Sequence, residues 1–186
     1  MTTLEIHPLT IEAMGFFWDE VGDDPETWQW IGGPAPIPRT KSDFVKAISD
    51  TVDSMACEYF YFKDSASGAI VAISAFLDIR PQDRHLEIGG TFISRRFRGG
   101  GTNYRMKLIM LTEAFEQRNC VRVTFKVNAL NQRSRDAVLR LGAKFEGALR
   151  NQREQRDGTW RTAAIYSIIV SEWPAVKKSL MEKLKG

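Results

Sequence analysis

The chain has 186 residues, of which 43% are hydrophobic and 26% are charged, a length that is sufficient for one compact α/β domain but short for two. Its 26 basic and 23 acidic residues give a formal net charge of only +3, which does not favour bulk binding to nucleic acid. No apolar run approaches the roughly 20 residues that span a bilayer, and two cysteines with two histidines suggest neither a disulfide framework nor a zinc site. We therefore predict a single domain over residues 1–186 in a reducing, cytoplasmic setting.

The N-terminal third predicts a strand, a helix, a long loop and a second helix. Residues 4–7 alternate between apolar and polar side chains as a strand does, and Thr10 is placed to cap the helix that follows. Pro, Gly and Asp are concentrated in residues 23–38, which predicts a long ordered loop. Thr40 or Ser42 would cap the second helix.

Large aromatic side chains gather in and just before this loop. Aromatic residues held in a loop either line a substrate pocket or cover an edge of the core, and the sequence alone leaves both explanations open. The four residues are Phe17, Trp18, Trp28 and Trp30.

The middle of the chain predicts a β-hairpin followed by a further strand. Residues 58–63 and 69–79 have strand composition and are separated by a tight turn at residues 65–68. A second turn at residues 81–84 leads into an extended segment at residues 86–93. The first two strands should therefore pair antiparallel.

Three consecutive glycines follow this extended segment and precede a helix predicted for residues 102–119. Gly99, Gly100 and Gly101 carry no Cβ, so they can adopt the positive φ angles that turn several N–H groups toward one point. These donors, together with the free N–H groups of the first helical turn, would form an anion site. We therefore predict a phosphate-binding loop.

The neighbouring residues restrict the kind of phosphate ligand. Arg98, with Arg95 and Arg96, would add positive charge around a pyrophosphate. A nucleoside triphosphate loop ends in Gly-Lys-Ser/Thr, but here Thr102 follows the glycines, and a dinucleotide fold requires glycine where Tyr104 stands. The sequence therefore argues against both of these ligand classes.

The helix after the glycines carries apolar residues at helical spacing, whereas Lys107 and Glu113 are predicted elsewhere on its circumference. The apolar residues are Tyr104, Leu108, Leu111 and Phe115. Residues 121–127 then alternate as a strand with one buried face. A strand, a helix and a strand joined in this way imply a parallel pair with the helix crossing one face of the sheet.

The C-terminal part predicts two helices separated by a hairpin. Asn131 is placed to cap a helix that Gly142 would end. Residues 144–153 and 161–170 predict two strands joined by an Asp-Gly turn. Ser171 would cap the last helix.

The glycine segment, Arg-Gly-Gly-Gly-Thr-Asn at residues 98–103, resembles the coenzyme A pyrophosphate loop of the GNAT N-acetyltransferases, whose pattern is Gln/Arg-x-x-Gly-x-Gly/Ala. Asn103 departs from this pattern at the last position, where a small residue is usual. Further motifs in the matching order resemble the RimJ/RimL-like branch, which acetylates ribosomal proteins. They lie at residues 86–89, 131–134, 141–143, 146–147 and 166–167.

This resemblance implies a fold, a cofactor and a set of contacts. The implied fold is α/β, with a mixed central sheet of about seven strands flanked by helices on both faces. The implied cofactor is acetyl-CoA. Its site would be formed by Phe92, Ile93, Arg98, Gly99, Gly100, Gly101, Thr102, Asn103, Asn131 and Ser134.

Acetyl transfer from a thioester to an amine needs a neutral amine, a polarised carbonyl and a proton source for the thiolate, all held in position. The resemblance implies that the backbone N–H groups of Phe92 and Ile93 polarise the carbonyl, and that Ser134 supplies the proton. From the residues alone, Asn131 is explained as a helix cap and Ser134 as an ordinary first-turn serine.

Glu87 is the candidate general base, acting directly or through a water molecule. Strand alternation predicts that it shares a face with Gly89 and Thr91, whose small side chains leave space for a substrate. A salt bridge to an arginine is the alternative explanation for Glu87. Related enzymes place a glutamate near residue 153, where this chain has Arg153 with Glu154 beside it.

The leading interpretation is an acetyl-CoA-dependent N-acetyltransferase that acts on a protein N-terminal α-amine or a small-molecule amine by direct attack in a ternary complex. In the family that the chain resembles, the N-terminal region lies over the acceptor site, so Trp28, Trp30 and Glu87 are the expected acceptor contacts. We expect neither a membrane nor a metal to take part, and the sequence leaves open whether the chain forms a homodimer.

Two other classes of function stay open on the sequence. A non-catalytic acyl-CoA-binding module would keep the glycine loop, and the arginine at position 153 favours it. An RNA-associated protein would use a basic face, although aromatic side chains for base stacking are not interleaved there. That basic face would consist of Arg95, Arg96, Arg98, Lys107 and Arg118.

Overall fold

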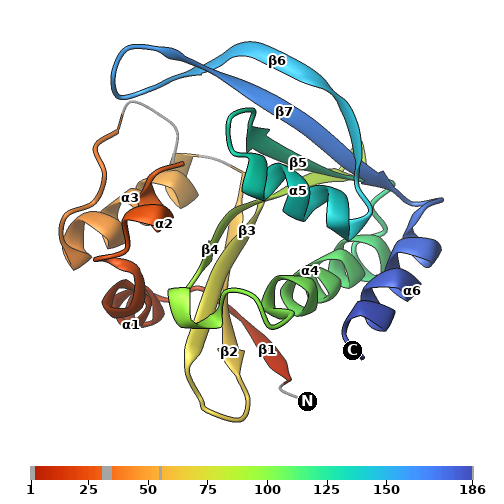
Figure 1. Cartoon of the computed structure of the whole chain (residues 1–186), viewed down its shortest axis with the longest axis horizontal. Coiled ribbons are helices and arrows are strands. Elements are labelled where there is room, and N and C mark those ends of the chain that lie inside the picture. Colours follow the sequence, from red (N-terminus) through yellow and green to blue (C-terminus); the bar gives the residue numbers. More distant parts are fainter. Residues whose placement is uncertain (1–2, 31–34, 55, 186) are drawn as a thin grey trace.

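The computed structural model describes residues 3–30, 35–54 and 56–185, and it is built on one seven-stranded sheet (Figure 1). The strands are β1 (Leu4–Pro8), β2 (Glu58–Asp64), β3 (Ile70–Arg80), β4 (His85–Ile93), β5 (Arg122–Asn128), β6 (Lys144–Glu154) and β7 (Trp160–Ile169). The α-helices are α1 (Ile11–Val21), α2 (Pro25–Trp28), α3 (Lys41–Ser54), α4 (Thr102–Thr112), α5 (Gln132–Leu141) and α6 (Trp173–Lys183). Part of the loop predicted for residues 23–38 lies outside the described residues.

The strand order is β1-β2-β3-β4-β5-β7-β6, and all neighbours are antiparallel except β4 and β5. The parallel pairing of β4 with β5 joins only residues 85–87 to residues 122–124. Beyond the pair of Glu87 and Thr124 the two strands no longer pair with each other. We refer to this unpaired part, residues 88–93 of β4 and 125–128 of β5, as the β4–β5 gap.

Helices cover both faces of the sheet, as Figure 1 shows, with α1 and α3 on one side and α4, α5 and α6 on the other. On the first side, which we call the α1 face, Phe17 and Phe44 pack on Ile73. On the second side, the α4 face, Met106 and Met110 pack against a larger apolar cluster of the sheet. The predicted fold, a mixed sheet of seven strands between two helical layers, is therefore confirmed.

Two predicted helix starts are confirmed by their caps. The Thr10 hydroxyl accepts a hydrogen bond from the Ala13 amide at 3.1 Å, and the Thr40 hydroxyl accepts one from the Asp43 amide at the same distance. Both satisfy N–H groups that a helix leaves free in its first turn.

Three local predictions were wrong. Residues 25–28 form a short helix rather than loop, because Pro25 occupies the first helical position and the Asp24 carboxylate accepts from the Glu26 amide. The last helix begins after Glu172 without a side-chain cap, so Ser171 is not its cap. The helix after the glycines is α-helical only to Thr112 and continues as a π-helical turn.

Within the described ranges, no helix is long and apolar enough to cross a membrane.

Candidate active site

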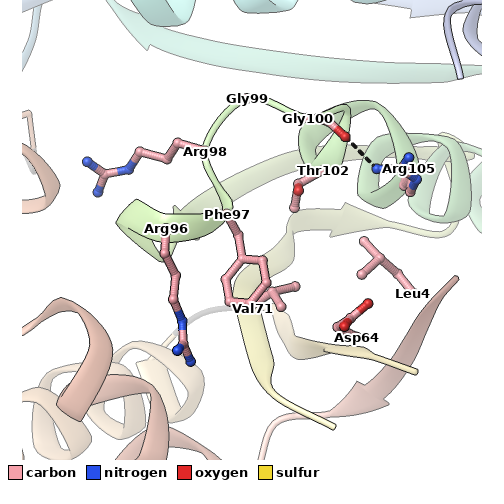
Figure 2. Close-up of a pocket in the computed structure, with 10 residues that line it drawn as sticks. All are labelled: Leu4, Asp64, Val71, Arg96, Phe97, Arg98, Gly99, Gly100, Thr102 and Arg105. Carbon is pink, nitrogen blue, oxygen red and sulfur yellow. Dashed lines mark hydrogen bonds between the residues drawn. The ribbon is translucent and has the colours of Figure 1, made fainter. Parts of the chain in front are cut away.

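The three glycines form a turn with free amides at the end of β4. Gly99, Gly100 and Gly101 have φ angles of +84°, +49° and +79°. In the described part of the chain, none of their three N–H groups donates a hydrogen bond, whereas the Thr102 amide donates to the Gly99 carbonyl at 3.2 Å. Arg105 stabilises the turn from α4 by donating to the Gly100 carbonyl at 2.6 Å (Figure 2). Three adjacent donors therefore stand at the start of a helix, as an anion site requires.

The arginines before the loop are not arranged around it as predicted. The Arg98 side chain is only 16% exposed, forms an ion pair with Asp24, and donates to the Thr27 hydroxyl at 2.7 Å. It also donates to the Ile93 carbonyl at 3.1 Å. Arg96 forms an ion pair with Glu20 at 2.6 Å. The charge expected around a phosphate is therefore largely neutralised by carboxylates of the N-terminal segment, and Arg98 links the end of β4 to α2.

The same pairing removes most of the basic face that an RNA-binding protein would need. Besides Arg96 and Arg98, Arg118 is paired with Glu58 at 2.6 Å, and Lys107 is buried. These side chains do not form a free basic surface.

A small hollow adjoins the glycine turn on the side of β1 (Figure 2). Its volume is about 210 Å³, which is below the size of typical ligand pockets, and the Asp64 carboxylate lies in its wall. Gly99, Gly100 and Arg105 line the same hollow, so an anion there would meet both the free amides and a guanidinium group (Figure 2).

The direction of the amides at the end of β4 follows from its pairing with β3. The Ser94 amide donates to the Val71 carbonyl at 3.0 Å, and Ile93 and Phe92 pair with the next two residues of β3. Because N–H groups alternate in direction along an antiparallel strand, the Ile93 amide points toward the β4–β5 gap and the Phe92 amide points toward β3. The geometry therefore supports Ile93, and not Phe92, as a donor to the gap.

A bulge in β4 changes which residues share a face. Gly90 has a φ of +55°, and the register with β3 shifts between Ile73 and Ala75. As a result the Thr91 hydroxyl lies on the α4 face, 2.8 Å from the Ser74 hydroxyl. The prediction that Thr91 shares a face with Glu87 was wrong, because strict alternation does not continue through a bulge.

Glu87 lies on the α1 face at the point where β4 and β5 part. Its side chain is buried and forms an ion pair with Lys126 at 2.7 Å, so its partner is a lysine rather than an arginine. Burial raises the pKa of Glu87 above its usual range, although Lys126 acts in the opposite direction. A Cβ at position 89 would lie 2.7 Å from Leu77 and 3.2 Å from the Glu87 carboxylate, so the lack of a side chain at Gly89 lets both of these groups pack against the backbone.

Tyr59 lies next to this bulge, although no motif in the sequence points to it. Its hydroxyl is 3.0 Å from where a Cβ of Gly90 would stand, and burial raises its pKa to about 12. The contact of this tyrosine with Gly90 depends on the bulge in β4. Because the bulge forms only in the folded sheet, the sequence around Tyr59 does not indicate the contact.

Asn131 and Ser134 lie at the start of α5, just after the end of β5. The Asn131 side chain accepts a hydrogen bond from the Ser134 amide at 3.0 Å, so the predicted helix cap is confirmed. The Ser134 hydroxyl is half-buried and, among the described residues, has no hydrogen-bond partner. It is therefore available to donate to a ligand.

The aromatic residues of the N-terminal region do not form one pocket lining. Trp28 is buried, donates from its indole N–H to the Val21 carbonyl at 3.1 Å, and packs on Phe92 at a centroid distance of 6.0 Å. Phe17 is fully buried in the same cluster. Trp30 is half-buried, and its contact with an acceptor stays a prediction.

Lys107 on α4 was predicted outside the apolar stripe, but it is buried against the bulge. Its ammonium group donates to the Thr91 hydroxyl at 2.7 Å and to the Ser74 hydroxyl at 3.0 Å. Ser74 in turn donates to the Gly89 carbonyl at 3.1 Å. Burial without a carboxylate partner lowers the pKa of Lys107 from 10.5 to about 7.

This burial predicts a pH-dependent stability. The unfolded chain holds the Lys107 proton up to pH 10.5, whereas the folded chain loses it near pH 7, so stability should rise with pH between these values. In Lys107→Met this contribution is absent, and Ser74 and Thr91 keep their mutual hydrogen bond. We expect the free energy of unfolding of the variant, taken relative to that of the wild type, to fall by about 1.4 kcal/mol per pH unit between pH 7.5 and 10. The reason is that the wild type gains stability over this range and the variant does not. Urea denaturation at each pH measures both values.

The control for this experiment is Lys178→Met, which replaces an exposed lysine on α6. It should show no such slope relative to the wild type. Parallel pH profiles for Lys107→Met and the wild type would contradict the prediction.

Comparisons with known proteins agree with this geometry. Residues 3–144 match the family model described as the acetyltransferase (GNAT) domain. A proposed acetyltransferase from T. thermophilus is 28% identical, with a TM-score of 0.87 over 98% of this chain and 94% of that chain. No curated protein matches the chain.

More distant structures share the fold. A GCN5-related N-acetyltransferase from Brucella melitensis is 24% identical, with a TM-score of 0.87 over 98% of this chain and 82% of that chain. Mycobacterium smegmatis RimJ, in complex with CoA-disulfide, is 17% identical, with a TM-score of 0.79 over 97% of this chain and 88% of that chain. Such identities show the fold alone, so the RimJ/RimL-like branch is not confirmed. The family model covers most of the chain, and the protein therefore belongs to the GNAT acetyltransferase family and is an acyltransferase.

Proposed function

We propose that the protein transfers an acetyl group from acetyl-CoA to a primary amine by direct attack in a ternary complex. The observation that carries this proposal is the position of the three free glycine amides at one end of the β4–β5 gap, with the buried carboxylate of Glu87 at the other. The helix α5 begins shortly after β5 ends, and α4 begins directly after the glycine turn that follows β4. Helix N-termini and free amides favour an anionic cofactor, and the buried carboxylate favours proton transfer.

The cofactor would be held by main-chain groups of this chain. Gly99, Gly100 and Gly101 would donate to its pyrophosphate. The Ile93 amide, which points toward the gap, would donate to the thioester carbonyl and stabilise the negative charge that develops there.

The reaction needs a balanced set of proton transfers. Glu87 would accept a proton from the incoming ammonium group, and the neutral amine would then form the new N–C bond as the C–S bond breaks. Ser134 would donate its hydroxyl proton to the departing thiolate, and the second proton lost by the nitrogen would replace it. The motif order favours a protein N-terminal α-amine as the acceptor, with a small-molecule amine as the alternative.

A thiol-release assay tests the proposal. Purified protein is mixed with acetyl-CoA and a panel of amines, and the free thiol is measured with time. We expect thiol release that depends on both the protein and the amine. Tight binding of coenzyme A without release for any amine would contradict amine acetylation.

Replacement of Ser134 tests its role as the proton donor. In Ser134→Ala we expect kcat to fall about 100-fold with little change in the Kd for coenzyme A, since a general acid acts on the leaving group and not on binding. Ser42→Ala, at an exposed first-turn serine of α3, is the control and should keep the wild-type kcat. An unchanged kcat in Ser134→Ala would exclude this serine as the acid.

A further inference from the structure

Two arginines share the α1 face of the sheet with Glu87. Arg153 on β6 pairs directly with Arg161 on β7, so both side chains lie on one face. Alternation along β7 puts Arg161 on the same face as Ile165, which pairs with Lys126 of β5. Lys126 forms the ion pair with Glu87, so four charged side chains of neighbouring strands lie on one face.

Among the residues that the structure describes, none pairs with the Arg161 guanidinium. Its Nε is fully buried and, in the ranges that the structure describes, makes no hydrogen bond. Neither Arg161 nor Arg153 has an ion pair with a described carboxylate, whereas Lys126 is already paired with Glu87 and lies 3.6 Å from Asp78. Burial and the repulsion of Arg153 lower the pKa of Arg161, against the attraction of Glu87. Arg161 is half-buried and Arg153 is exposed, and an arginine with a buried, unpaired Nε is stabilised when an anion pairs with it.

The arginines also lie on the face of the sheet where Glu87, the proposed base, would receive an acceptor. The helices α4, α5 and α6 pack on the opposite face, where Phe125 and Tyr166 join their cluster. The hairpin of β6 and β7 reaches over toward the segment before α3, and Arg156 near its tip donates to the Ala35 carbonyl at 2.6 Å (Figure 1). The α1 face between this hairpin and β4 is therefore bordered by the N-terminal segment.

We propose, on the basis of the proposed function, that Arg153 and Arg161 bind a carboxylate of the acceptor, so that the enzyme prefers amines with a carboxylate a few atoms away. A bidentate carboxylate would satisfy the unpaired guanidinium donors of Arg161. The surrounding cations would repel an ammonium group and so favour its neutral, nucleophilic form. A polycationic acceptor would meet the same repulsion without a compensating anion.

The test compares acceptors that differ only in charge. Peptides with Glu, Gln or Lys at the second position, and free amino acids with their amides, are assayed for kcat/KM with the wild type. We expect at least a ~10-fold preference for the acceptor with the carboxylate, because an unpaired buried donor discriminates strongly against an acceptor that cannot pair with it. Arg161→Gln should reduce this preference to near unity, and Arg161→Lys should restore part of it, while the KM for acetyl-CoA stays unchanged.

Arg140→Gln, at an exposed arginine of α5, is the matched control and should keep the wild-type preference. Equal kcat/KM for charged and amide acceptors would overturn the inference alone. The inference would also be overturned if Arg161→Gln raised the KM for acetyl-CoA but kept the preference in kcat/KM for the carboxylate acceptor. The arginines would then bind the cofactor. Acetylation of no amine at all would overturn the proposed function and this inference with it.

Discussion

Substitution of Gly100 by phenylalanine is expected to weaken coenzyme A binding at least ~100-fold while the protein stays folded. Gly100 has a φ of +49°, and a Cβ added to it would have no other protein atom within 4 Å. A bulky side chain would therefore leave the packing intact but disfavour the turn that aims the three amides at one anion. Each hydrogen bond to a charged group contributes about 1.5–3 kcal/mol, so loss of two of them is sufficient for this effect. The Kd is measured by isothermal titration.

The control is Gly158→Phe in the turn between β6 and β7. Gly158 has a φ of +77° and equally open space at its Cβ position. A phenylalanine there should therefore impose similar backbone strain at a place far from the glycine turn in the sequence. Gly101 is a poorer choice, since its Cβ would lie 3.2 Å from both Arg105 and Leu184 and would disturb packing as well. If Gly100→Phe bound coenzyme A as tightly as the wild type, the glycine turn would not be the pyrophosphate site.

Replacement of Glu87 by glutamine is expected to lower kcat by a factor of about 100 or more, with an unchanged Kd for coenzyme A. The amide keeps the shape of the carboxylate but cannot accept the proton of the ammonium group. Burial raises the pKa of Glu87, so the base becomes protonated at a pH above the usual glutamate range. The wild-type kcat should therefore fall as the pH is lowered through this raised pKa. The variant should lack this acid limb in a profile of kcat against pH.

Glu154→Gln serves as the comparison, because Glu154 is the second carboxylate that the sequence offers as a base. It is exposed at the end of β6, whereas Glu87 is buried and paired with Lys126. We expect near wild-type kcat for Glu154→Gln. The reverse result, a loss of kcat in Glu154→Gln but not in Glu87→Gln, would show that Glu154 is the base.

Local features of the site were predictable because they depend on neighbouring residues in the chain. The glycine turn follows from the positive φ angles that only glycine adopts without strain, and the Asn131 cap follows from the free N–H groups of a helix start. The parallel pairing of β4 with β5 follows from the helix that connects them.

Features that depend on tertiary contacts were not predictable. The bulge at Gly90 reverses the alternation of β4, and nothing in the sequence of the strand distinguishes Gly90 from Gly89. Lys107 is buried because the Ser74 and Thr91 hydroxyls meet it on the sheet, whereas a lysine in a helix normally predicts an exposed position. The partners of Arg98 come from residues about 70 positions away in the chain, so no local pattern indicates them.

The contacts of Arg98 have a mechanical consequence. One guanidinium group donates both to the Ile93 carbonyl at the end of β4 and to the Thr27 hydroxyl of α2, so it ties these two segments together. A displacement of α2 would therefore be transmitted through Arg98 to the end of β4. If the proposed cofactor binds beside β4, we therefore expect its binding to reduce the mobility of α2 as well.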